Sequence, residues 1–185
     1  MFRRSIIVAA IGSALAVATA TASWIADQGH SQLKLAPRWA EIAWPFPMDE
    51  WGTGKAYRCA AADCGHEVEV YLRGKLGFCN CTTGVADDAE LDRLSDFDLL
   101  GGRAKPLSEG RPVRVAWMAG RSRAFALPGL LSRKAMMSVA FSNECDALVA
   151  TAVFEQDAAP SAEPQVLAFL NSVAVERWAK AELGR

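Results

Sequence analysis

The first 26 residues determine which part of the chain can fold as a domain. Arg3 and Arg4 precede residues 5–26, a stretch without a single charged side chain. A short basic segment followed by an apolar core and small residues is typical of a secretory signal peptide. Residues 18–22 contain two alanine-rich triplets that suit signal peptidase. We therefore predict a leader over residues 1–22, and a domain that folds outside the cytoplasm.

An uncleaved leader would act as a membrane anchor instead. About 20 uncharged residues can span a bilayer as a helix, and residues 5–26 reach that length. In both cases the two arginines stay on the cytoplasmic side. We expect a periplasmic domain that is either released or anchored to the inner membrane, and we expect membrane contact only through this segment.

The charge of the remaining chain argues against nucleic acid as a partner. The protein has 20 basic and 21 acidic residues, and two of the basic ones lie in the leader. The rest is therefore mildly acidic, whereas binding to phosphate backbones needs a basic surface.

Residues 23–54 form an entry segment rich in tryptophan and proline. Proline lacks an N–H and has a fixed φ, so it interrupts helices and central strands. We therefore predict that residues 43–54 form an extended strap. Its large aromatic rings either cover one side of the core or form the surface for an unknown protein partner, because such rings are common at binding hot spots. The residues of this candidate partner surface are Trp39, Trp44, Phe46 and Trp51.

Residues 66–78 carry the clearest strand pattern. Apolar residues occupy the even positions and mainly charged residues the odd ones. A period of two with one apolar face predicts a half-buried strand. Residues 55–59 are its expected hairpin partner.

The later chain adds strands and helices. We predict a helix over 87–99, a hairpin of 112–118 with 123–127 that turns at 119–122, and a second hairpin of 135–141 with 147–154. A helix over 163–183, which Asn171 and Ser172 could interrupt, closes the chain. The expected fold class is α+β: a single domain over 55–185, with a mostly antiparallel sheet of about six strands, one short helix and one long C-terminal helix.

Four of the five cysteines lie close together in the sequence. If the hairpin gathers them at one end, two disulfides would stabilise it, because disulfides form and persist outside the cytoplasm. We expect Cys79 and Cys81 to pair with Cys59 and Cys64, in an order that the sequence leaves open. Cys145, the fifth, is expected to carry a free thiol.

The same cluster has two alternative interpretations. Cys59, Cys64, Cys79 and Cys81, with His66 as a further ligand, could bind zinc or Cu(I) as thiolates; we otherwise expect no cofactor. The Cys79–x–Cys81 pair could alternatively serve thiol–disulfide exchange, although redox enzymes more often place Cys-x-x-Cys at a helix N-terminus.

No catalytic motif accompanies these cysteines. The chain has two histidines, His30 and His66, and it contains neither a Gly-x-Ser-x-Gly elbow nor a His-Glu-x-x-His motif. The sequence therefore favours a non-enzymatic accessory or binding domain.

Three segments carry a resemblance to a known group of proteins. Residues 44–47 (Trp-Pro-Phe-Pro), residues 77–84 and residues 169–172 (Phe-Leu-Asn-Ser) resemble an uncharacterised family of small exported proteins of alphaproteobacteria. The resemblance runs through most of the chain after the leader. It implies a Gram-negative periplasm, and it brings no known activity, cofactor or catalytic residue.

Overall fold

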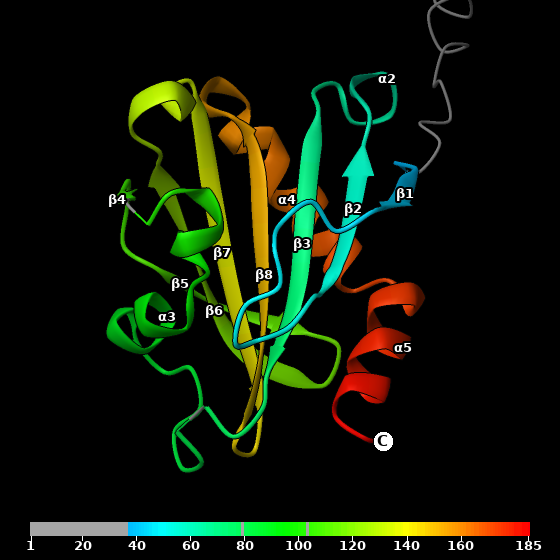
Figure 1. The fold of residues 1–185 in the computed structure, drawn as a ribbon, viewed down its shortest axis with the longest axis vertical. Helices are drawn as coiled ribbons and strands as arrows, with labels where there is room; N and C mark the ends of the chain where they lie inside the picture. The colour runs from blue at the N-terminus through cyan, green and yellow to red at the C-terminus, as the bar shows by residue number, and fades with distance from the viewer. Residues whose placement is uncertain (1–36, 79, 103) are drawn as a thin grey trace, which may run out of the picture. The chain divides into compact units, whose positions relative to one another are not determined.

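A single antiparallel sheet forms the centre of the protein (Figure 1). The computed structural model describes residues 37–185 except 79 and 103, so the predicted leader lies outside the described residues. The sheet has eight strands, in the order β1-β2-β3-β8-β7-β6-β4, with β5 also paired to β6. The strands are β1 (Trp39–Ile42), β2 (Lys55–Cys59), β3 (Val68–Lys75), β4 (Lys105–Pro106), β5 (Arg111–Val115), β6 (Met118–Ala126), β7 (Lys134–Asn143) and β8 (Asp146–Glu155).

Helices α4 (Ala159–Leu170) and α5 (Val173–Glu182) cover one face of this sheet (Figure 1). Their buried side chains, among them Val166, Leu170 and Val175, pack with Val70 and Leu72 of β3 in the main hydrophobic core. The period-two pattern of residues 66–78 thus correctly identified the apolar face of β3.

Residues 43–54, α3 (Asp88–Leu94) and the 3-10 turn η1 (Phe97–Leu100) cover the opposite face (Figure 1). Leu91 and Leu94 of α3 pack with Val149 of β8. The strap packs through Trp44 and Phe46 against Tyr71 of β3. The prediction that strap rings cover the core is confirmed for these two residues.

The remaining elements are short. Helix α2 (Ala61–Cys64) lies in the β2–β3 connection, η2 (Gly129–Leu131) precedes β7, and η3 (Gln156–Ala158) leads into α4. The predicted long C-terminal helix is divided at Asn171. The side chain of Asn171 accepts a hydrogen bond from the backbone N–H of Ala116, 2.9 Å away, and Ser172 caps α5.

The fold class is mixed α and β with an antiparallel sheet, as expected, but several details differ. The sheet has eight strands rather than about six, and it begins at Trp39, within the predicted entry segment. Central strand β3 lies between β2 and β8 and is covered on both faces, so it is not half-buried.

The first predicted turn was also misplaced. Strands β5 and β6 are joined at Ala116 and Trp117, not at residues 119–122. Gly120, which suggested the turn, lies inside β6. A Cβ atom there would come within 2.2 Å of the Ala140 carbonyl oxygen, so this glycine is needed for close strand packing rather than for chain reversal.

We predict that Trp39 holds β1 on the sheet rather than serving mainly as a partner surface. Its ring stacks on Phe169 of α4 at 4.3 Å. Trp39→Ala should lower the free energy of unfolding by about 2 kcal/mol, below the range for a fully buried ring because Trp39 is half-buried. Urea denaturation would measure this, with Trp39→Phe as the milder control; unchanged stability in the alanine variant would contradict the assignment.

Candidate functional site

Two buried cations lie beneath the strap. Arg73 and Lys75 project from β3 on the face away from α4 and α5, with exposed fractions of 3% and 4%. Both contact the buried carboxylate of Asp96: Arg73 Nη2 lies 2.7 Å and Lys75 Nζ 2.9 Å from its Oδ1. Lys75 also donates to the Leu94 carbonyl at 2.7 Å. One buried carboxylate thus serves two buried cations.

Asp49 of the strap supplies the second carboxylate. Both of its oxygens lie 2.6 Å from Arg73 Nη1. The same side chain accepts from the Trp51 N–H at 2.9 Å, and the Asp49 carbonyl accepts from the Gly52 N–H at 3.0 Å. Asp49 therefore balances the buried charge and fixes the turn that carries Trp51.

The two strap tryptophans each cover one of the cations. The guanidinium of Arg73 lies 5.8 Å from the Trp44 ring centroid, and Lys75 Nζ lies 5.1 Å from that of Trp51. Such contacts are stabilising when the cation is desolvated. Trp44 and Trp51 thus have a clear structural role in covering the buried charges.

The protonation states of Arg73 and Asp49 follow from the contacts between them and with Asp96. Burial alone would lower the pKa of Arg73, but its hydrogen bonds to Asp96 and Asp49, together with the attraction of their negative charges, outweigh burial and raise the pKa. The hydrogen bond from Arg73 is the main cause that lowers the pKa of Asp49. Both groups are therefore held in their charged forms.

Apolar side chains border this charged cluster: half-buried Trp51 contacts exposed Phe78, and Leu76, two residues before Phe78, is also exposed. We call these three residues the aromatic patch. The rings of Trp51 and Phe78 meet edge to face at 4.9 Å. Leu76 and Phe78 are 52% and 40% exposed, so two large apolar side chains in neighbouring positions of one turn face solvent. Leu76 and Phe78 follow the end of β3, where the sequence analysis had expected the strand to continue.

The loop that carries Phe78 is fixed at several points. Arg93 of α3 donates to the Phe78 carbonyl at 2.7 Å, and its guanidinium lies 4.4 Å from the Phe78 ring centroid. The Gly77 N–H donates to Asp146 of β8 at 2.7 Å. A disulfide joins Cys81 to Cys145 in the β7–β8 turn. The exposed Phe78 ring is therefore held by contacts with α3, and its neighbours Gly77 and Cys81 are bound to the β7–β8 turn region.

The disulfide pairing corrects the sequence prediction. The structure joins Cys59 to Cys64 and Cys81 to Cys145, so Cys145 is not a free thiol. Cys79, the remaining cysteine, lies outside the described residues.

The topology explains this pairing. Cys59 pairs in register with Val68 at the start of β3, whereas Cys81 follows the far end of β3. The eight residues of β3 span about 25 Å at the usual rise per residue. At that far end Lys75 pairs with Ala147, next to Cys145. The expectation that one end of the hairpin gathers the cysteines was therefore wrong for Cys81.

This separation also bears on the proposed metal site. Cys59, Cys64 and His66 lie at one end of β3 and Cys81 at the other, and the described cysteines are all oxidised. Among the described residues, no group of three His, Cys, Asp or Glu side chains is placed to hold a metal ion. A joint thiolate site that uses both Cys59 and Cys81 is not formed.

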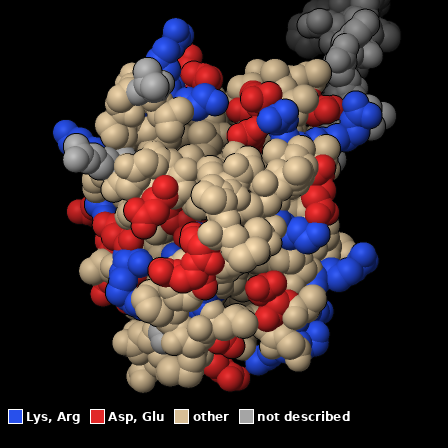
Figure 2. Space-filling model, in the orientation of Figure 1, with Lys and Arg blue, Asp and Glu red and all other residues tan. Residues whose placement is uncertain are grey.

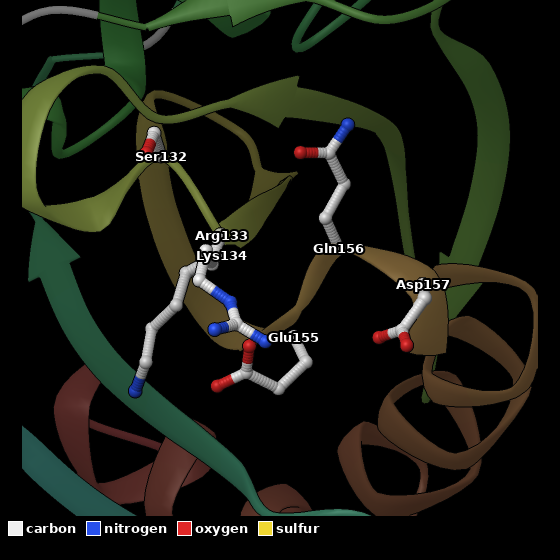
Figure 3. Close-up of a pocket in the computed structure, with 6 residues that line it drawn as sticks. All are labelled: Ser132, Arg133, Lys134, Glu155, Gln156 and Asp157. Atoms are coloured by element: carbon white, nitrogen blue, oxygen red, sulfur yellow. The ribbon is translucent and has the colours of Figure 1, made fainter.

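A broad surface hollow lies where β7 begins and β8 ends (Figure 3). Its volume is about 700 Å³, and its lining residues are Ser132, Arg133, Lys134, Glu155, Gln156 and Asp157. In Figure 3 the side chains of Lys134, Gln156 and Asp157 point in different directions. These three side chains therefore do not converge on one point of the hollow.

Neither the surface charge nor the comparisons with known proteins identify a function for these residues. Acidic and basic side chains are interspersed on the face shown in Figure 2.

Comparison with protein-family models, curated proteins and solved structures finds no match for this chain. In the described part of the chain, no helix has the length and apolar character needed to cross a membrane.

Sequence reasoning missed Asp49, Arg73, Lys75 and Asp96. Charged residues alternate with apolar ones in β3, and that pattern is normally typical of a solvent-exposed face. The charges were not recognised as buried, because only the sheet order shows that β3 is central.

We predict that Asp96 is the most sensitive residue of the charged cluster. Asp96→Asn would leave two buried cations without their buried counterion, at a cost of about 3–5 kcal/mol. Asp49→Asn should cost about 1 kcal/mol or less, because the Asp49 carboxylate is 38% exposed. Urea unfolding at neutral pH would measure both, and an equal loss in the two variants would contradict this ranking.

The lowered pKa of Asp49 adds a pH signature to the same comparison. The stabilisation from this group should be present above its ordinary pKa of 3.8 and be lost as pH falls through its lower folded-state pKa. Asp49→Asn should remove this contribution to the acid dependence of stability.

We predict that the two disulfides differ in their resistance to reductant under native conditions. Cys81 is exposed and Cys145 half-exposed, whereas Cys59 and Cys64 are buried. Thiolate attack requires access to a sulfur, so Cys81–Cys145 should open first. Stepwise reduction, alkylation and fragment mass spectrometry would show the order, with denatured protein as the control in which the protection of Cys59–Cys64 disappears.

Proposed function

We propose that the chain is an exported, non-enzymatic accessory domain that binds a protein partner through the aromatic patch. The observation that carries this proposal is the contact between half-buried Trp51 of the strap and exposed Phe78 of the β3–α3 connection, with Leu76 also exposed two residues before Phe78. Exposed apolar side chains of this size are typical of interaction surfaces.

The contacts that hold the loop around Phe78 support a role of its exposed side chains in partner binding. Three separate contacts hold it: Arg93 binds the Phe78 carbonyl, Asp146 binds the Gly77 N–H, and Cys145 is bonded to Cys81. A surface that is already ordered loses less conformational entropy when it binds. Loops fixed on a rigid scaffold commonly carry binding residues.

The two disulfides support the exported location. Disulfides persist in oxidising compartments such as the periplasm and are rare in the cytosol. The leader predicted over residues 1–22 agrees with this location. Whether the domain is released or anchored depends on cleavage of that leader.

Site-specific photo-cross-linking tests this function. The full chain, expressed with its own leader, would carry p-benzoylphenylalanine in place of Leu76 or, as the control, in place of Leu107. Both leucines are about half exposed, at 52% and 47%. We expect a protein adduct from position 76 in the periplasmic or membrane fraction, none from position 107, and loss of the adduct when Phe78→Ser is added.

Three outcomes would contradict parts of the proposal. Equal adducts from both positions would show that the patch is not selective. An adduct of twice the chain mass would identify a second copy instead of a different partner. Recovery of the oxidised chain only in the cytoplasmic fraction would contradict export.

A further inference from the structure

A notch opens at the edge of the sheet where the strap leaves β1. Beyond Ile42 the chain turns away from β2, and a cavity of about 440 Å³ lies between the strap, the start of β2 and α5. Trp44 of the strap and Trp178 of α5 both line it, and they come from the two layers on opposite sides of the sheet. The notch is thus bordered by two half-buried indole rings.

Two glycines make room for the groups that line this notch. A Cβ atom on Gly54 would lie 2.9 Å from Cζ3 of Trp44 and 2.0 Å from the Leu72 carbonyl oxygen. A Cβ on Gly74 would lie 2.7 Å from Oε1 of Glu182. Neither glycine has a positive φ, so backbone conformation does not require them. They allow the Trp44 ring and the Glu182 carboxylate to rest directly against the strands.

The charge of the notch is negative. Glu41 and Lys55 on its border form an ion pair at 2.5 Å and neutralise one another. Glu182 has no ion-pair partner within residues 37–185 as far as the structure describes them. One carboxylate therefore stands beside two aromatic rings in a concave site.

We propose that this notch binds an alkylammonium group. Indole faces attract cations through their quadrupole, and the attraction grows as the cation is desolvated. The Glu182 carboxylate adds a direct charge partner, and it disfavours phosphates and carboxylates by repulsion. Alkylammonium groups occur both in small quaternary ammonium compounds and in lysine side chains. A free solute and a peptide could therefore both supply the bound group. This site is separate from the aromatic patch and does not depend on it.

Isothermal titration of the intact, oxidised domain with defined probes tests the proposal. Choline represents the free solute, Nα-acetyl-lysine amide represents the peptide source, and 3,3-dimethylbutanol is the neutral isostere of choline. We expect at least one cation to bind about five- to tenfold more tightly than the neutral isostere. The tighter of the two cationic probes identifies the source.

Three variants test the residues. Glu182→Gln and Trp178→Leu should each weaken cation binding about three- to tenfold. Gly74→Ala should do the same by displacing the flexible Glu182 side chain, with little loss of stability. Glu176→Gln is the matched control, because Glu176 lies on the same helix, bonds to Lys180 and does not line the notch.

Unfolding curves of each variant separate loss of binding from loss of fold. Equal affinity for choline and its neutral isostere would overturn the proposal, as would unchanged cation affinity in folded Glu182→Gln. Absence of binding by both cationic probes at millimolar concentration would also overturn it.

Discussion

The ion pair between Arg73 and Asp96 is the interaction on which one whole face of the protein depends. Neither charge is accessible to water, and Lys75 adds a second buried cation to the same carboxylate. Buried charges are tolerated only when they are paired and hydrogen-bonded. The segment between α3 and η1, which supplies Asp96, is therefore required for the strap to cover this face of β3 without leaving buried charges unpaired. Asp49 then brings the second negative charge, so the strap is part of the same arrangement.

This buried cluster also shapes the exposed surface beside it. Asp49 binds Arg73 with its carboxylate and the Trp51 N–H with the same group, so the position of Trp51 follows from an interior ion pair. Trp51 in turn contacts Phe78, whose loop is held from the other side by Arg93 and the Cys81–Cys145 disulfide. Trp51 and Phe78 are thus linked through these contacts to the packed interior, although Phe78 is 40% exposed.

Local patterns predicted local structure well. Alternation correctly identified the apolar face of β3, residues 55–59 were correctly predicted as its hairpin partner, and turn residues placed the β7–β8 hairpin. The predictions that failed depend on the order of the strands in the sheet, which no local sequence pattern encodes. Because β8 pairs with β3, Cys145 lies beside the end of β3 and forms a disulfide with Cys81. The same pairing makes β3 a central strand, so its charged face is buried. Gly120 led to a wrong turn prediction for a related reason. A glycine is needed at this position because β7 packs closely against β6 there.

The strap joins the two surfaces that we assign to binding. Trp44, at one end, borders the notch and lies over Arg73, while Asp49 and Trp51, further along, bind Arg73 and form the aromatic patch. A segment with three prolines nearby and little regular structure is thereby held by side-chain chemistry rather than by backbone pairing. Its aromatic residues are consequently neither purely core nor purely surface. Each covers a buried cation or ring and is itself only half-buried.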